Sequence, residues 1–326
     1  MAGTILHSTY GMKTKGPNDP IVLNLKDALE NLGKAVLASN FLVNVFPALK
    51  RIPDWFPWTE WKRTARKWRD HKNNAVDTPY YWTKSQIALP EHEPSMIESV
   101  LEQTRRMGLS PDEADDYAKE IAFVLFAGGT DTTTNTILVF FVAMILFPET
   151  QRKAQAEIDA VIGSTRLPEM EDRSQLPYMH QLIQELLRWR PIVPAGLAHV
   201  CYQDDVYKGY RIPKGAIMAI NHNPKVYKDP QLFNPDRFAD PSMPRASTFG
   251  FGRRLCQGSH FAEASLFIFI SSIIATFNIE MAQDEHGNNL VPVAESENSM
   301  LFHPVPFKFK LSIRSSAHEQ LIRAGM

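Results

Sequence analysis

Apolar residues recur at helical spacing along most of the chain, and polar or charged residues fill the positions between them. Proline-rich stretches separate these periodic segments. The pattern predicts helices over residues 20–46, 111–147, 149–162, 174–190 and 259–277. Ser110 is a suitable cap for the second of them, because proline and two acidic residues follow it at the positive end of the helix. Helices therefore account for most of the expected fold.

Two segments are typical of β-structure. DDVYKGYRIPKG (204–215) places strand-forming residues around Gly209 and predicts a hairpin. LFHPVPFKFKLSIRS (301–315) alternates like a strand pair at the end of a domain. The expected fold class is mainly α with a small β subdomain.

The segment DWFPWTEWKRTARKWRD (54–70) combines aromatic and basic residues. The spacing of its four tryptophans predicts that they share one helical face beside a basic face; they are Trp55, Trp58, Trp61 and Trp68. The favoured interpretation is a helix that packs its aromatic side chains on the core. The alternative is peripheral contact with a membrane, since basic amphipathic helices with aromatic residues suit the interface.

Charge and cysteine content narrow the function classes. The formal net charge of −1 over 326 residues gives no overall field that attracts nucleic acid. The two cysteines cannot form a disulfide framework, which favours a reducing compartment. The N-terminus lacks the pattern of a signal peptide, and the longest apolar runs are shorter than a bilayer span. We therefore expect no anchor in this chain.

The strongest chemical signal is FGFGRRLCQG (249–258). Gly252 and Gly258 flank Cys256 and let a flat ligand lie against the main chain. Arg254 and the helix that begins near residue 259 favour a thiolate. The absence of a second cysteine or a histidine at zinc spacing argues against zinc and iron–sulfur sites. A single thiolate is what haem-thiolate proteins use.

This run resembles the haem-binding loop of the cytochrome P450 superfamily, the haem-thiolate monooxygenases. The resemblance implies that Cys256 is the axial ligand of haem b iron and that Arg254 contacts a haem propionate. It also assigns Phe249, Gly252 and Gly258 to the same cofactor loop. His199 is a second candidate for a propionate contact, with an ordinary surface or core histidine as the alternative.

Two more family patterns occur in the expected order. FAGGTDTTTNT (126–136) resembles the oxygen-activating pattern, which implies that Asp131 and Thr132 relay protons to bound dioxygen. Its two helical glycines each cost about 1 kcal/mol relative to alanine, and close approach of a ligand would offset that cost. The alternative is a Gly/Thr-rich helix contact without catalytic function.

The third pattern is Glu-x-x-Arg followed by a Pro-x-Arg-Phe turn. It falls on Glu185, Arg188 and Arg237 and implies a buried structural cluster that supports the cysteine loop.

The resemblance also implies partners. These are a small apolar substrate, dioxygen and NADPH-cytochrome P450 reductase, with Arg253 and Arg254 near the face of electron entry. Candidate substrate contacts, for which plain core packing is the alternative, are Val124, Leu125, Leu197 and Leu301. Details such as RWRPIVPAGLAH resemble fungal secondary-metabolism members of the O-methylsterigmatocystin oxidoreductase type.

The chain departs from the family pattern at its start. Residues 1–326 match a single cytochrome P450 domain that lacks its N-terminal third, and the propionate-binding Trp-x-x-x-Arg does not occur. The family usually occupies the cytoplasmic side of the endoplasmic reticulum membrane. Three functions stay open: a monooxygenase, a catalytically inactive truncated haem-binding fragment, and an enzyme that rearranges peroxides without a reductase.

Overall fold

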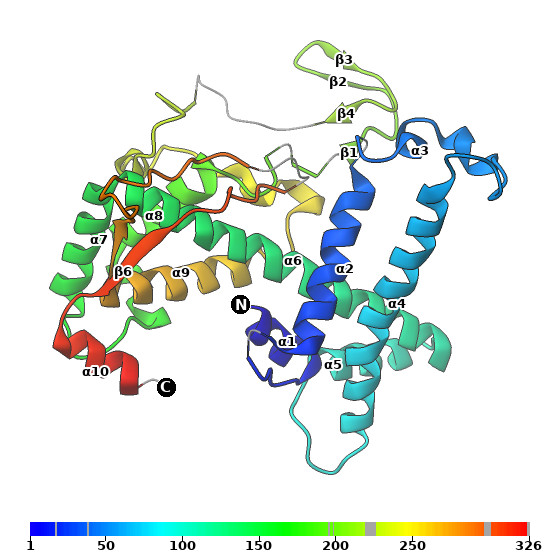
Figure 1. Cartoon of the computed structure of the whole chain (residues 1–326), viewed down its shortest axis with the longest axis horizontal. Helices are drawn as coiled ribbons and strands as arrows, with labels where there is room; N and C mark the ends of the chain where they lie inside the picture. Colours follow the sequence, from blue (N-terminus) through cyan, green and yellow to red (C-terminus); the bar gives the residue numbers. More distant parts are fainter. Residues whose placement is uncertain are drawn as a thin grey trace. The chain divides into compact units, whose positions relative to one another are not determined.

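The structure is a computed structural model in which the chain divides into two compact units, residues 1–134 and 135–326 (Figure 1). The assignment of residues 1–326 to a single domain stays a prediction. The structure describes residues 1–16, 18–37, 39–194, 196–197, 199–218, 226–296 and 301–324.

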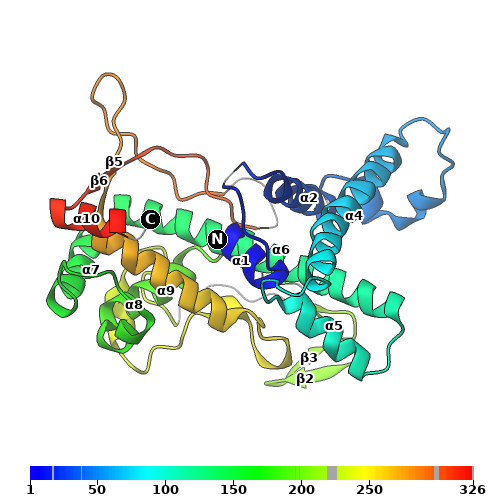
Figure 2. The ribbon, with the colours of Figure 1, turned by 90° about the horizontal axis from the view of Figure 1, so that it is seen from below.

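The first unit is helical. The long helices α2 and α4 lie side by side (Figures 1 and 2). Its core holds the fully buried side chains of Leu6, Leu25, Tyr80 and Phe126. The helices are α1 (Ala2–Tyr10), α2 (Pro20–Val36), α3 (Leu42–Val45), the 3-10 helix η1 (Pro47–Arg51), α4 (Glu60–Ile87), α5 (Met96–Arg106) and α6 (Pro111–Leu146), which continues into the second unit.

The second unit packs helices around a larger apolar core. Helices α7, α8 and α9 contact one another, and Phe140, Leu186 and Ile270 are fully buried among them. Its helices are α7 (Pro148–Val161), η2 (Met170–Gln175), α8 (Pro177–Trp189), η3 (Pro235–Ala239), η4 (Ser247–Phe249), η5 (Gly252–Arg254), α9 (Ser259–Thr276) and α10 (Ser316–Ala324).

The described strands form three antiparallel pairs. The predicted hairpin is present, and Gly209 has the positive φ of +83° that its tight turn requires. The C-terminal strand pairs with the segment after α9, Phe277 opposite Ile313. The pairs are β1 (His199–Val200) with β4 (Ile217–Met218), β2 (Asp205–Tyr207) with β3 (Tyr210–Ile212), and β5 (Phe277–Met281) with β6 (Phe309–Ile313). The mainly α fold with small sheets is thereby confirmed.

The start of α6 agrees with the sequence prediction. The backbone N–H of Glu113 donates to the Ser110 hydroxyl at 3.4 Å, and the Ser110 N–H donates to the Glu113 carboxylate at 3.0 Å. This reciprocal cap satisfies backbone donors that a helix N-terminus leaves unpaired.

The predicted helix over residues 20–46 is wrong in its second half, because α2 ends at Val36. The side-chain amide of Asn40 donates to the Lys34 carbonyl at 3.0 Å, and that of Asn44 donates to the Ala35 and Leu37 carbonyls at 2.9 and 3.0 Å. These side chains replace the hydrogen bonds that a continuing helix would have made.

The shared face of four tryptophans is also wrong. Trp55 and Trp58 precede α4, and their side chains are 81% and 89% exposed. Trp58 has a φ of +66°, which a regular helix does not contain. The hydroxyl of Thr59 donates to the carbonyls of Asp54 and Phe56, so a turn forms there instead. Of these four tryptophans, Trp61 and Trp68 belong to the helix.

Two helices, α6 and α9, are long and apolar enough to cross a bilayer by length and composition alone. About half of the most apolar window of α6 is buried, and a smaller share of that of α9. Core helices of water-soluble proteins have the same character, so the property is weak evidence for a span.

Candidate functional site

The loop that carries Cys256 is held by its own backbone. The Cys256 N–H donates to the Phe249 carbonyl at 2.9 Å, and the Ser259 N–H donates to the Cys256 carbonyl at 3.2 Å. Gly250 and Gly252 have φ values of +77° and +60°, which residues other than glycine rarely adopt. The two glycines let the chain fold back on itself just before the start of α9.

The Cys256 thiol lies on an exposed surface of this loop. Phe249 is half-buried and packs on the core of the second unit, whereas Gly252, Arg254 and Gly258 are exposed. A Cβ on Gly258 would lie 3.9 Å from the Cys256 sulfur, so the glycine keeps the side of the thiol clear. An exposed thiol between glycines fits an iron that the protein binds through one sulfur from one face.

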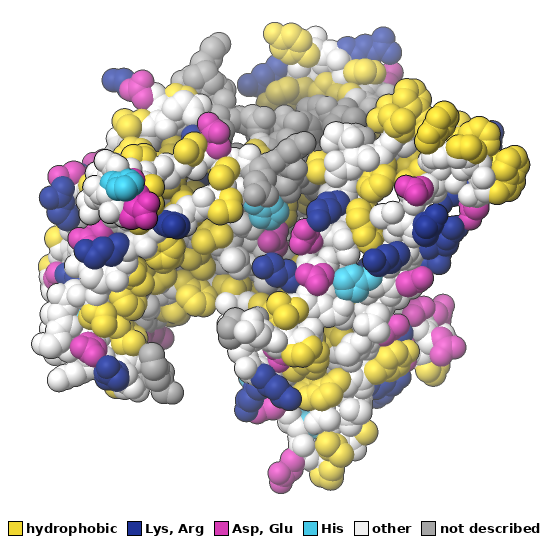
Figure 3. Space-filling model, in the orientation of Figure 1, with side chains coloured by type: hydrophobic (Ala, Val, Ile, Leu, Met, Phe, Trp, Pro, Cys, Tyr) yellow, Lys and Arg dark blue, Asp and Glu magenta, His cyan; other side chains and the backbone are white. Residues whose placement is uncertain are grey.

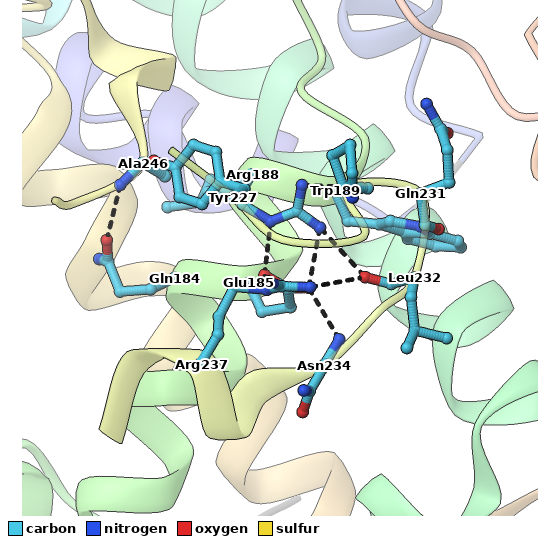
Figure 4. Close-up of polar contacts among 12 residues, drawn as sticks. Gln184, Glu185, Arg188, Trp189, Tyr227, Gln231, Leu232, Asn234, Arg237 and Ala246 are labelled. Atoms are coloured by element: carbon cyan, nitrogen blue, oxygen red, sulfur yellow. Dashed lines mark hydrogen bonds and ion pairs between the residues drawn. The ribbon is translucent and has the colours of Figure 1, made fainter. Parts of the chain in front are cut away.

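Glu185, on α8, lies between the two arginines that the sequence pattern groups with it (Figure 4). Its side chain is fully buried. Arg188 Nε and Nη2 donate to its two oxygens at 2.6 and 2.8 Å, and Arg237 Nε donates at 3.1 Å. The backbone N–H of Asn234 adds a fourth bond at 2.7 Å. The carboxylate is therefore paired and hydrogen-bonded, as a buried charge must be.

The arginines of this cluster also bind the backbone of the segment before Arg237. Arg188 Nη1 donates to the Pro230 carbonyl at 2.8 Å, and Arg237 Nη1 donates to the Lys228 carbonyl at 2.9 Å. The cluster thus fastens the segment 228–237 to α8.

Two further side chains tie α8 to the chain just before the cysteine loop, and sequence reasoning did not find them. Gln184 Oε1 accepts a bond from the Ala246 N–H at 3.3 Å, and the Thr248 hydroxyl donates to the Leu187 carbonyl at 2.7 Å. The signal was weak: Gln184 is a polar residue inside the apolar run of α8, where a buried amide needs a partner.

Asp131 and Thr132 lie on α6 within the first unit, and both are half-buried. The Thr132 hydroxyl donates to the Gly128 carbonyl, one turn earlier, at 2.5 Å. Gly129, two residues before Asp131, was expected to lie close to a ligand, but its neighbour in the structure is Ile5. A Cβ on Gly129 would lie 2.6 Å from the Ile5 Cδ1 atom, so α1 approaches α6 closely at this point. Gly128 has no such neighbour.

The other candidates are more scattered. His199 is exposed at the start of β1. Val124 is exposed and Leu125 is half-buried in the first unit, whereas Leu197 is exposed and Leu301 packs on the core of the second. Their contact with a substrate therefore stays a prediction.

Known proteins match this chain over nearly its full length. Residues 2–311 match the family model for cytochrome P450. The cytochrome P450 monooxygenase claR of Ampulloclitocybe clavipes is 40% identical over 96% of this chain and 59% of its own length. The multifunctional cytochrome P450 monooxygenase af510 of Aspergillus fumigatus is 37% identical over 99% of this chain and 63% of its own length. The chain thus spans about three fifths of the curated relatives it matches.

Solved structures agree on the fold. A zebrafish cytochrome P450 determined with abiraterone has a TM-score of 0.74 at 22% identity, covering 96% of this chain and 70% of its own. A second zebrafish structure, determined with progesterone, has a TM-score of 0.75 at 23% identity, with 96% and 69% covered. With its fungal relatives and the family-model match, this chain belongs to the cytochrome P450 family.

Proposed function

We propose that this chain is the cysteine-bearing part of a haem-dependent monooxygenase that inserts one atom of dioxygen into an apolar organic substrate in fungal secondary metabolism. The observation that carries the proposal is the exposed Cys256 thiol, in a glycine-bearing loop whose backbone bonds fix its course. The family membership and the fungal monooxygenase relatives support the same activity.

The residues of the second unit would bind the cofactor. Cys256 supplies the thiolate, and the glycines at 252 and 258 leave room for a flat ring beside it. Arg254 and His199 are the candidates for the carboxylates of the ring. When bound, haem supplies the iron at which dioxygen is reduced and one oxygen atom passes to the substrate.

Asp131 and Thr132 would hold and deliver protons. A carboxylate and a hydroxyl at consecutive positions of a largely apolar helix would supply the protons that O–O cleavage requires. The Thr132 hydroxyl donates to the Gly128 carbonyl, and its oxygen can still accept a hydrogen bond from a neighbouring group.

Electrons would come from NADPH-cytochrome P450 reductase. Arg253 and Arg254 are both exposed, three and two residues before Cys256 in the same loop, and two cations there favour an acidic partner surface. We assign the protein to the cytoplasmic face of the endoplasmic reticulum. The exposed Trp55 and Trp58 support peripheral contact with that membrane, because aromatic rings favour its interface.

The second candidate function is a haem-binding fragment without catalytic activity. The chain covers only 59 to 64% of the length of the relatives named claR, af510 and the Armillaria gallica monooxygenase. A haem-binding fragment needs Cys256 but not the proton relay, and a partner-binding fragment needs neither.

Turnover separates these functions. The purified chain is reconstituted with haem, reductase and NADPH, and oxygen uptake is measured with 7-ethoxycoumarin as an apolar probe. A monooxygenase consumes NADPH and oxygen. Both activities are expected to be lost in Cys256→Ala and kept in Cys201→Ala, the matched thiol control. Haem binding without NADPH consumption identifies the inactive fragment, and conversion of a hydroperoxide without reductase identifies the peroxide-rearranging enzyme.

A further inference from the structure

A cavity of about 350 Å³ lies wholly within the first unit, between α2, α4, the segment at residues 41–44 and one residue of α6. This volume is at the lower end of the range of small-molecule sites. Its walls are mostly apolar. They include Leu32, Ala35, Phe41, Trp61, Trp68 and Phe123. The rings of Phe41 and Trp68 meet edge to face at 5.7 Å, which gives one side of the cavity a defined shape.

Cations lie at one side of these walls. Arg69 and Lys72 both line the cavity. Lys72 is paired with Glu120 and lies over the Phe123 ring. Arg69 is exposed, and its Nε atom lies 3.4 Å from the Asp70 carboxylate. An exposed pair of this length holds a guanidinium weakly, so Arg69 can turn to another anion.

The surrounding helix segment strengthens this charge. Between Glu60 and Lys72 the sequence holds six Lys or Arg residues and two acidic residues, a formal charge of +4. Figure 3 shows hydrophobic side chains gathered over α3 and Lys or Arg side chains nearby on α4. The exposed hydrophobic residues of this region include Leu42, Val45 and Phe46. An apolar cavity with a basic side therefore opens next to an apolar surface.

We propose that this cavity binds a single alkyl chain that ends in a carboxylate, such as a free long-chain fatty acid. The alkyl chain lies between the rings of Phe41, Trp61 and Trp68, where burial of apolar area stabilises it. The carboxylate accepts hydrogen bonds from Arg69, whose planar guanidinium matches its geometry. The assignment does not depend on Cys256 or on haem, since every residue involved lies in the first unit.

Tryptophan fluorescence tests the site directly, because Trp61 and Trp68 line it. The probe is 9,10-dibromostearate, whose bromine atoms quench nearby indoles. Titration of the full chain below the micelle concentration is expected to quench saturably. Ala65→Leu fills the cavity from the exposed face of α4 and is expected to raise the dissociation constant about tenfold or more. Asn73→Leu adds the same side chain to α4 outside the cavity and is expected to match the wild type.

The charge is tested with a second pair of variants. Arg69→Gln is expected to raise the dissociation constant of the acid about threefold and to leave that of its methyl ester unchanged. Arg63→Gln removes an exposed cation of the same helix that does not line the cavity, and it is expected to change neither ligand.

Two results would overturn the proposal. One is quenching that stays the same in Ala65→Leu, or no saturable quenching at all. The other is quenching that occurs only with neutral phosphatidylcholine vesicles carrying brominated chains and that is lost in the double variant Trp55→Phe/Trp58→Phe. That result would mean that the exposed loop inserts into a bilayer and that the cavity binds nothing. Haem-free protein serves throughout, so failure of the proposed enzyme activity cannot imitate failure here.

Discussion

Glu185 shows how strongly one buried carboxylate can depend on its partners. Its loss leaves Arg188 and Arg237 as buried cations, with side chains only 2% and 6% exposed. Breaking a buried ion pair on one side costs about 3–5 kcal/mol. We therefore predict that Glu185→Gln lowers the free energy of unfolding of the second unit by about that amount, as measured by urea titration followed by circular dichroism.

The matched control for this prediction is Glu149→Gln on α7. Glu149 pairs with Arg152 at the same three-residue spacing, but both side chains are exposed. Exposed pairs contribute about 1 kcal/mol or less. Equal losses in the two variants would show that the Glu185 cluster does not stabilise the fold as described.

The glycines of the cysteine loop make a second residue-level prediction. Gly250 combines a φ of +77° with a ψ of −161°, a conformation almost closed to other residues. Gly250→Ala is expected to cost about 1–3 kcal/mol and to speed proteolysis of the loop. Gly258→Ala is the control, because its φ of −85° suits any residue. A larger loss in Gly258→Ala would contradict this account of the loop.

Sequence spacing predicts which side chains contact each other where the two residues are close in the chain. Glu185 and Arg188 are three residues apart on a helix, so their meeting could be predicted from the pattern alone. The bond from the Ala246 N–H to Gln184 joins positions 62 residues apart. No periodicity encodes such a contact, because it depends on how the loop after η3 returns to α8.

At the scale of elements, the two glycines of α6 differ in their surroundings. Gly128 has open space where a Cβ would lie, so Gly128→Ala is expected to stabilise the first unit by up to about 1 kcal/mol through helix propensity. Gly129→Ala places a Cβ against Ile5 and is expected to gain less or to lose stability. Thermal unfolding of both variants measures the difference.

Ile5→Val provides the control for this pair, since it removes the Cδ1 atom that the new methyl group would meet. In that background the two alanine variants are expected to converge. A difference that persists would assign the effect of Gly129 to something other than the contact between α1 and α6.

The turn between α7 and α8 contains a pH-dependent contact. Arg166 donates two bonds to Asp172, at 2.6 and 2.7 Å, and with the Glu169 N–H it lowers the pKa of Asp172 to about 2 from an ordinary 3.8. A lowered folded-state pKa adds stability above about pH 3.8, and that stability is lost as the pH falls toward 2.

Arg166→Gln is therefore expected to be less stable than the wild type at pH 6, with a difference that shrinks as the pH falls to 2. Urea titrations at several pH values measure it. Arg323→Gln, which removes an exposed partner of Glu319, is the control and is expected to show a small difference throughout. A constant difference for Arg166→Gln would contradict the assigned contact.

Element type was easier to predict than element ends. The amphipathic α7 follows from apolar periodicity, and the mostly apolar α6 and α9 follow from long apolar runs, since burial of apolar surface stabilises a helix. The end of α2 at Val36 depends instead on side-chain amides of Asn40 and Asn44 that bind its last carbonyls. An apolar run continues past that point in the sequence, so periodicity overestimated the helix.

For the whole molecule, the cytochrome P450 fold and the exposed thiol of Cys256 together support the proposed haem site. The chain contains the segments with the cysteine loop, the Glu185 cluster and the Asp131–Thr132 pair, and it spans about three fifths of its curated relatives. The activity proposed for it therefore rests first on whether these segments hold haem through Cys256.

The most direct test is the absorption spectrum of the purified chain, reconstituted with haem, reduced with dithionite and exposed to carbon monoxide. We predict a strongly red-shifted Soret band, the signature of thiolate-bound haem iron, that is lost in Cys256→Ala and kept in Cys201→Ala. Absence of haem binding, or the spectrum of a protonated or replaced ligand in the wild type, would contradict it.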